Sequence, residues 1–302
     1  MKVILIQCPS WCEFAPPYAL ALLSACLRQQ GHEVYGFDLN IKLYNHVKSV
    51  ERKEAWGTSG GSNSWFEHNY VLNLMDKHKG YIDSLIQQVL NIGAPVIGFS
   101  VQDTTRIFSE EFARRIKEKD RDKIIVFGGA SCFKNSIYYM DFLRRPYVDA
   151  LCLREGEFAF LDFLKEVESK GEISFCPGFA YRDKKENVRD CGEKELITDL
   201  GVLPFADFSD FQLEEYETRT LPISTSRGCI YSCAFCNEAP FWERYRSRSA
   251  SNIFAEMSHQ LIKNPSVENF FFNDSLINGN IDMLDELADL IIKNKLKIRW
   301  GG

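Results

Sequence analysis

The feature that most constrains the fold is a regular alternation of short apolar strands and helices over the first 170 residues. Runs of Val, Ile, Leu and Phe of this kind are typical of strands buried on both faces, as in a parallel sheet covered by helices. The strands are expected at 3–7, 33–37, 95–101, 124–127 and 148–153. We therefore predict an α/β fold that begins with a doubly wound, Rossmann-like parallel sheet over residues 1–170.

Local signals set the ends of the intervening helices. Pro16-Pro17 opens a helix that runs to about Gln30, where Gly31 stops it, because proline suits a first helical turn and glycine suits the residue after the last. Further helices are predicted up to about Ile92 and through about Glu118. The Gly-Ser-rich stretch at 56–65 is predicted to be a loop.

The carboxyl ends of these strands carry small and polar residues. In open parallel sheets ligands bind at this edge, and small residues let a ligand approach the backbone closely. The candidate ligand-binding residues there are Pro9, Ser100, Gln102, Gly128, Gly129, Glu155 and Gly156. The pair Gly128-Gly129 is not a GxGxxG fingerprint, so a nicotinamide dinucleotide is not expected.

The pattern changes after residue 170. A hairpin with a polar tip is predicted at 176–191, and an acidic and aromatic linker follows it, so residues 171–220 form a hairpin-and-linker segment. A second α/β region then covers 221–302. Its strands are predicted at 222–226, 270–272 and 297–300, with helices at 249–263 and 281–293.

Three of the ten cysteines, Cys229, Cys233 and Cys236, are spaced CxxxCxxC directly after a predicted strand. Thiolates are the usual ligands of iron–sulfur clusters, and this spacing lets one loop wrap three corners of a cubane. No fourth cysteine is near in sequence, which leaves one iron open to an exogenous ligand. Gly228 allows the chain to turn sharply into the loop. The sequence thus predicts a [4Fe–4S] cluster.

Two other interpretations of the three cysteines stay open. A structural zinc site usually takes four ligands, and the first histidine after the loop, His259, lies in a predicted helix. Chance core cysteines are the other alternative, although the segment is loop-like. Of the scattered cysteines, Cys26 and Cys152 lie in apolar runs and are expected in the core, and Cys8 and Cys12 are a candidate metal pair.

Charge and hydropathy exclude several classes of partner. The net charge of −6 argues against nucleic acid as a partner. No stretch reaches the ~20 apolar residues that span a bilayer, and residues 1–6 look like a first strand rather than a signal peptide, so we expect a cytoplasmic protein with no membrane partner. Arg244, Arg246 and Arg248 are a local basic exception, either a solvated face or a contact for an anionic ligand.

The CxxxCxxC spacing, the aromatic Phe235 before the last cysteine and the position after a first strand resemble the radical S-adenosylmethionine (SAM) superfamily. The resemblance implies that Cys229, Cys233 and Cys236 hold the cluster, that SAM binds its open iron, and that reduction cleaves SAM to methionine and a 5′-deoxyadenosyl radical. It also implies SAM contacts by Phe235, Asn273 and Asp274. Many members have Gly-Gly-Glu at the end of this second strand and this chain does not, so Asp274 is alternatively a helix cap.

Further motifs resemble the subgroup that carries an N-terminal cobalamin (B12)-binding domain. They are Pro16-Pro17, Gly31-His32-Glu33-Val34, Phe127-Gly128-Gly129-Ala130, Arg154-Glu155-Gly156-Glu157 and Leu203-Pro204. The resemblance implies that a corrin binds at the strand ends given above. The DxHxxG motif that supplies a lower histidine ligand elsewhere is absent, and a domain without corrin is the alternative.

The expected function is cobalamin-dependent radical SAM chemistry, with methyl transfer to an unactivated centre of a small-molecule or natural-product-like substrate. The expected electron donor is a flavodoxin or ferredoxin. Alternatives are a radical SAM enzyme without cobalamin, methylthiotransferase-like or performing a rearrangement, and a non-catalytic cofactor-binding module. The family's barrel has six strand–helix units, whereas 221–302 supplies two and the start of a third, so we expect a C-terminally incomplete chain.

Overall fold

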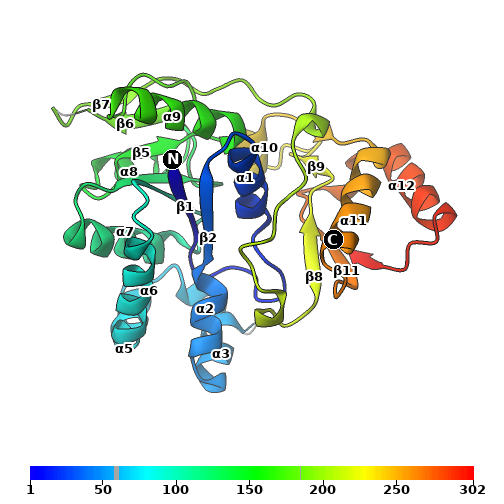
Figure 1. Cartoon of the computed structure of the whole chain (residues 1–302), viewed down its shortest axis with the longest axis horizontal. Helices are drawn as coiled ribbons and strands as arrows, with labels where there is room; N and C mark the ends of the chain where they lie inside the picture. The colour runs from blue at the N-terminus through cyan, green and yellow to red at the C-terminus, as the bar shows by residue number, and fades with distance from the viewer. Residues whose placement is uncertain (58–60, 184) are drawn as a thin grey trace.

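The computed structural model describes residues 1–57, 61–183 and 185–302. Within them, the first domain is built on a seven-stranded sheet in the order β2-β1-β3-β4-β5-β6-β7, and its first five strands are parallel (Figure 1). The strands are β1 (Lys2–Gln7), β2 (Glu33–Asp38), β3 (Val96–Ser100), β4 (Ile124–Gly128), β5 (Ala150–Cys152), β6 (Phe179–Arg182) and β7 (Val188–Asp190). The strand order reverses between β1 and β3, which is where doubly wound sheets place their ligand.

Two layers of helices cover this sheet. One face is packed by α1 (Tyr18–Gln29) and α9 (Gly156–Lys170). The other face is packed by α5 (His68–Lys77), α6 (Lys79–Asn91), α7 (Arg106–Lys119) and α8 (Tyr139–Arg144). Because both faces are covered, the side chains of Val3 to Ile6 are all buried, as the apolar pattern of the strand predicts.

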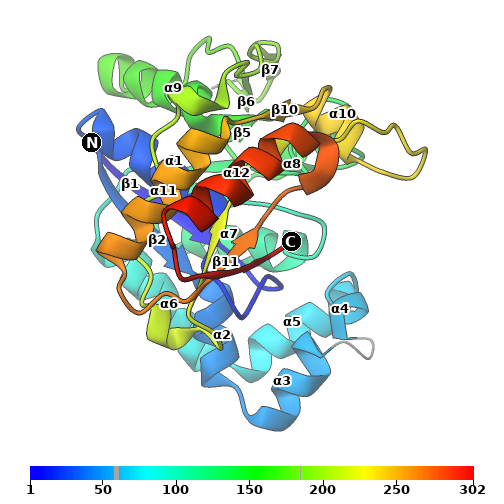
Figure 2. The same cartoon turned by 90° about the vertical axis from the view of Figure 1, so that its right-hand side faces the viewer.

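The second domain lies beside the α1 face of the first (Figures 1 and 2). Its parallel sheet, β12-β11-β8, consists of β8 (Thr220–Ile223), β11 (Asn269–Phe272) and β12 (Arg299–Gly301). Helices α11 (Ala250–Lys263) and α12 (Ile281–Lys293) pack against each other. One apolar core runs from Leu5 and Leu22 of the first domain to Leu221 and Phe270 of the second, so the two domains share buried surface.

The segment between the domains contributes to both. β6 and β7 form the predicted hairpin, but β6 pairs antiparallel with β5, so the hairpin extends the first sheet. Beyond it, Phe208, Phe211 and Tyr216 are buried in the shared core. Arg28 of α1 forms ion pairs with Asp207 (2.6 Å) and Asp210 (2.7 Å), which hold this segment on the first domain.

A few elements differ from the sequence prediction. Residues 39–55, which the sequence left unassigned, lie mostly in α2 (Leu39–His46) and α3 (Ser49–Trp56), and α3 also takes in Trp56 of the predicted loop. The loop predicted at 56–65 contains the short helix α4 (Gly61–Ser64), and positions 58–60 lie outside the described residues, as does Lys184 at the hairpin tip. The strand predicted at 222–226 is two strands, β8 and β9 (Ser226–Arg227), and β9 pairs antiparallel with β10 (Arg246–Ser247).

Among the residues that the structure describes, no helix is long and apolar enough to cross a membrane.

Candidate active site between the two domains

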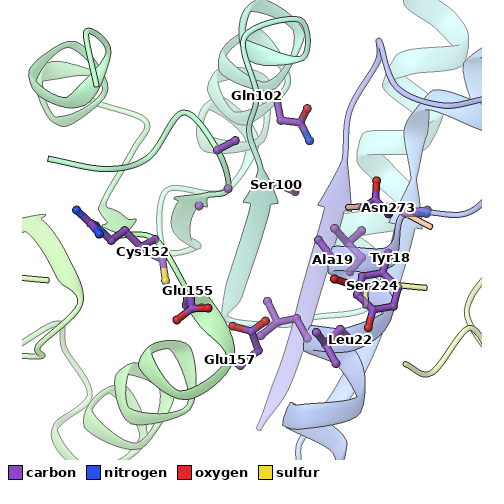
Figure 3. Close-up of a pocket in the computed structure, with 18 of the residues that line it drawn as sticks. Tyr18, Ala19, Leu22, Ser100, Gln102, Cys152, Glu155, Glu157, Ser224 and Asn273 are labelled. Carbon is purple, nitrogen blue, oxygen red and sulfur yellow. The ribbon is translucent and has the colours of Figure 1, made fainter. Parts of the chain in front are cut away.

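A cavity of about 460 Å³ opens where the carboxyl ends of both sheets meet (Figure 3). This volume lies within the range of pockets that hold small molecules and cofactors. The first domain contributes Ser100, Gln102, Gly128, Gly129, Glu155 and Gly156, all of them predicted from the strand ends. The second domain contributes Asn273 and Asp274, the pair predicted from the end of the second strand. The two predicted ligand regions are therefore parts of one cavity.

The floor of the cavity is apolar and extends between the first sheet and its helices α1 and α9. Leu5, Leu22, Val126 and Phe160 line it. Gly98 of β3 also lines it, and a Cβ atom at Gly98 would lie 3.2 Å from Leu5 Cδ2 and 3.5 Å from Phe160 Cζ. This apolar part of the cavity, the slot between the sheet and α1 and α9, therefore exists partly because residue 98 is a glycine without a side chain.

The loops after β3 and β4 are held to each other at the rim. Val101 N donates to Gly128 O (2.7 Å), Ser131 N donates to Val101 O (3.1 Å), and the Ser131 hydroxyl donates to Asp103 (2.7 Å). Gly129 has φ of +95°, and a Cβ there would lie 2.9 Å from Val101 O. Only glycine therefore fits at position 129, which explains the second residue of the glycine pair that the sequence singles out.

Asp274 lines the cavity and also has a local role that the sequence did not predict. Its carboxylate accepts from Thr225 N (2.9 Å), from Ser226 N and from the Ser226 hydroxyl (2.9 Å), so it ties the end of β11 to the turn after β8. Burial raises the pKa of Asp274, and these donors lower it in part. The helix-cap alternative was wrong, because Asn280 caps α12 by accepting from Met283 N. Asn273 is exposed beside it.

Four charged residues form a buried ion-pair quartet: Glu155, Glu157 and Arg227, which line the cavity, and Arg246 behind them. Arg227 Nη1 donates to Glu155 (2.6 Å) and its Nη2 donates to Glu157, while Arg246 Nη1 donates to Glu155 (2.8 Å). All four side chains are 10% exposed or less. Two positive and two negative charges balance, so no net charge is buried, and Glu155 is engaged by arginines rather than free for a ligand.

Arg246 and Arg248 of the basic stretch are therefore neither part of a solvated face nor free contacts for an anion. Arg246 belongs to the quartet, and Arg248 is buried against Glu256 of α11. Trp242 covers the quartet, with its ring 5.3 Å from the Arg227 guanidinium and 5.9 Å from that of Arg246. Arg244 is exposed. Sequence reasoning missed Arg227 and Trp242, although Arg227 immediately precedes Gly228-Cys229, and it named Glu157 only within the motif Arg154-Glu155-Gly156-Glu157.

The three predicted cluster ligands lie in the cysteine loop, residues 228–245, which leaves and returns through the β9–β10 pair. Cys233 is exposed, and Cys229 and Cys236 are partly exposed. Gly228 has φ of +80°, and a Cβ there would lie 2.5 Å from Arg244 O, so the two ends of the loop pass in close contact. Across the described residues, no three His, Cys, Asp or Glu side chains converge as around one metal ion, and the ligand assignment stays a prediction.

The remaining predicted residues lie apart from the cavity. Phe235 is 90% exposed on the cysteine loop, and Pro9 follows β1 outside the residues that line the cavity. Cys8 and Cys12 do not form a metal pair with a third ligand in the described part of the chain. Burial raises the pKa of Cys8 to about 12, which is typical of a core thiol, and Cys26 and Cys152 are buried as predicted.

Two solved enzymes share this arrangement of the two domains. The chain superposes on OxsB, solved with aqua-cobalamin and S-adenosylmethionine bound, with a TM-score of 0.70 over 99% of its length at 19% identity. It superposes on TsrM from Kitasatospora setae, solved with tryptophan and a SAM analogue, with a TM-score of 0.63 over 99% of its length, also at 19% identity. The chain has the fold of the cobalamin-dependent SAM radical enzymes. The predicted fold class is confirmed.

Curated proteins with similar sequences include methyltransferases and cyclases. The chain is 23% identical over 228 residues to an anaerobic magnesium-protoporphyrin IX monomethyl ester cyclase from Rubrivivax gelatinosus, covering 72% of this chain. It is 23% identical over 310 residues to cytidylyl-2-hydroxyethylphosphonate methyltransferase from Streptomyces wedmorensis, covering 90%. The chain spans 40% and 53% of the lengths of these relatives, and 38% of OxsB. No family model matches it.

Proposed function

We propose that this chain forms the cofactor-binding half of a cobalamin-dependent radical SAM enzyme that transfers a methyl group to a small-molecule substrate. The observation that carries the proposal is the shared cavity: the strand ends of both domains, where the family resemblance implies corrin and SAM binding, open into the same space. Chemistry that combines two cofactors needs them side by side, because reacting groups must be held within contact distance.

The first domain fits a corrin. The apolar slot between α1, α9 and β3 accepts a flat apolar group, and a side chain at Gly98 would fill it. At the rim, Ser100, Gln102 and the backbone around Gly129 supply hydrogen-bonding groups to a ligand edge. A few polar groups over an apolar floor are the usual composition of a cofactor pocket.

The cysteine loop fits a cluster by the chemistry of its donors. Its three thiols come from one short loop, and no disulfide joins them. Cys229, Cys233 and Cys236 would ligate three irons, and Asn273 at the neighbouring strand end would contact SAM. When bound, the cluster would supply the electron for SAM cleavage, and the corrin would carry the methyl group. We propose that a flavodoxin or ferredoxin delivers the electron.

The protein's own residues would position these groups and exclude water. Asp274 fixes the turn after β8 through Thr225 and Ser226, so the strand end that faces the cavity is rigid. Trp242 and Phe241 line the cavity from the cysteine loop and cover its wall with apolar surface. A dry, preorganised site strengthens polar contacts to a charged ligand such as the amino acid moiety of SAM.

The first test is anaerobic reconstitution with iron and sulfide, followed by EPR spectroscopy with and without SAM. We expect about four irons per chain and a spectrum that changes when SAM is added. Cys233→Ala should lose the cluster, whereas Cys26→Ala, which removes a core thiol, should keep it. Uptake of zinc in place of iron, or a cluster that ignores SAM, would refute the radical SAM assignment.

The second test separates corrin binding from cluster binding. Wild-type protein mixed with hydroxocobalamin and desalted should keep about one corrin per chain, read from its visible spectrum. Gly98→Val, which fills the slot, should retain at least tenfold less corrin and still assemble the cluster. If the wild type releases all corrin, the methyltransferase proposal fails and a radical SAM enzyme without cobalamin remains.

A further inference from the structure

Three of the four residues in the turn at the start of α9 contact the segment that carries the cysteine loop. This clamp turn consists of residues 154–157. Besides Glu155 and Glu157 in the quartet, Arg154 forms ion pairs with Glu193 (2.8 Å) and with Glu243 (2.6 Å) at the far end of the loop. Figure 3 shows Glu155 and Glu157 on the same side of the cavity. The turn therefore contacts both ends of a loop from another domain.

These contacts surround the base of the loop. Arg227 lies two residues before Cys229 and is held by Glu155 and Glu157. On the return side, Arg246 donates to Glu155 and to Ile197 O (2.6 Å). β9 pairs directly with β10, with Arg227 opposite Arg246. The stretch between them, which holds all three cysteines, is largely exposed, so its position depends on this base.

We propose that the clamp turn is a positioning element of the cysteine loop: the N-terminal domain, through Glu155 and Glu157 on Arg227, sets where the three thiols lie relative to the cavity. The effect of the clamp turn on SAM binding rests on the proposed function, whereas its effect on the position of the cysteine loop does not. Arg227 suits this role because its planar guanidinium engages two carboxylates at once, which a lysine ammonium does less well.

The test begins with the metal-free protein, measured by hydrogen–deuterium exchange. Glu157→Gln keeps the size of the side chain and removes one of the two negative charges that hold Arg227. We expect exchange in a peptide spanning 224–236 to rise at least fivefold. The matched control is Arg28→Gln, which breaks the ion pairs to Asp207 and Asp210 away from the loop and should leave that peptide unchanged. Unchanged exchange in Glu157→Gln would overturn the proposal.

A second variant keeps the proposal testable even where Glu157→Gln fails to fold. Glu243 is more than half exposed, so Glu243→Gln removes only the Arg154 contact at the far end of the loop. It should raise exchange at 237–246 and leave the melting temperature within 2 °C of the wild type. Equal exchange in this variant and in the wild type would count against a clamp.

The last readout is spectroscopic. In reconstituted protein, Glu157→Gln should keep its iron content, because the cysteines are intact, but need at least tenfold more SAM to change the EPR spectrum. Equal SAM affinity in the two proteins would show that the clamp does not position the cluster. A wild-type protein without any SAM response would instead refute the proposed function, while the exchange result would still decide the effect on the loop.

Discussion

Asp38, at the end of β2, gives a prediction whose size follows from its surroundings. The side chain is buried, with only 2% of the residue exposed, and its carboxylate accepts from Ile41 N (3.1 Å) and from the Tyr216 hydroxyl (2.9 Å). Burial raises the pKa of Asp38 from 3.8 to about 7, because the neutral donors around the carboxylate only partly replace the hydration of the charge. The folded protein therefore holds a proton on Asp38 that the unfolded chain releases.

The sign of the pH dependence follows from this difference. Since the folded pKa is raised, the stabilising contribution is complete below about pH 4 and is lost as pH rises toward 7. The full difference corresponds to about 4 kcal/mol, of which about 2.5 kcal/mol falls between pH 5 and pH 8. Asp38→Asn mimics the protonated carboxyl and removes this titration. The stability of Asp38→Asn relative to the wild type should therefore increase by about 2.5 kcal/mol from pH 5 to pH 8.

Urea unfolding followed by tryptophan fluorescence at pH 5, 6, 7 and 8 measures this difference directly. Tyr216→Phe serves as the control, because it removes one hydrogen bond and keeps the titrating carboxyl; its own pH dependence should persist. A constant difference between Asp38→Asn and the wild type across this range would refute the reasoning. It would mean that Asp38 stays ionised at the N-terminus of α2.

Two further predictions concern the second domain. Glu256→Ala should lower the free energy of unfolding by about 3–5 kcal/mol, because it leaves the charge of Arg248 unpaired and Ala206 N without its acceptor. Urea unfolding measures the loss, with the exposed Glu286→Ala as the control. A loss below 1 kcal/mol would contradict the buried pair. Gly228→Ala should lower the melting temperature and the iron content more than Gly31→Ala, which shares the positive φ but has no atom within 4 Å of its new Cβ. Equal effects in the two variants would mean that the positive φ, and not the close contact of the new Cβ at position 228, accounts for the whole loss.

The sequence determined the features that depend on neighbours along the chain. Apolar runs of strand length, separated by helices, specify a parallel sheet covered on both faces, and β1 to β5 follow that pattern. The strand ends then place Ser100 and Gly128 at one edge of the first sheet and Asn273 at the corresponding edge of the second, because the carboxyl ends of parallel strands face the same way. The spacing of Cys229, Cys233 and Cys236 is equally local, since three thiols in eight residues lie in one loop in any fold.

The tertiary structure decided the partners of the charged residues. Glu155 resembles a ligand residue in the sequence, yet it is paired with Arg227 and Arg246, which lie 72 and 91 positions away. Arg248 lies in a basic stretch that is typical of a solvated face, yet it is buried against Glu256. The physical reason is that a charge can be buried only where an opposite charge meets it. Which charges meet depends on the packing of two domains onto one core, and residue spacing does not encode that packing.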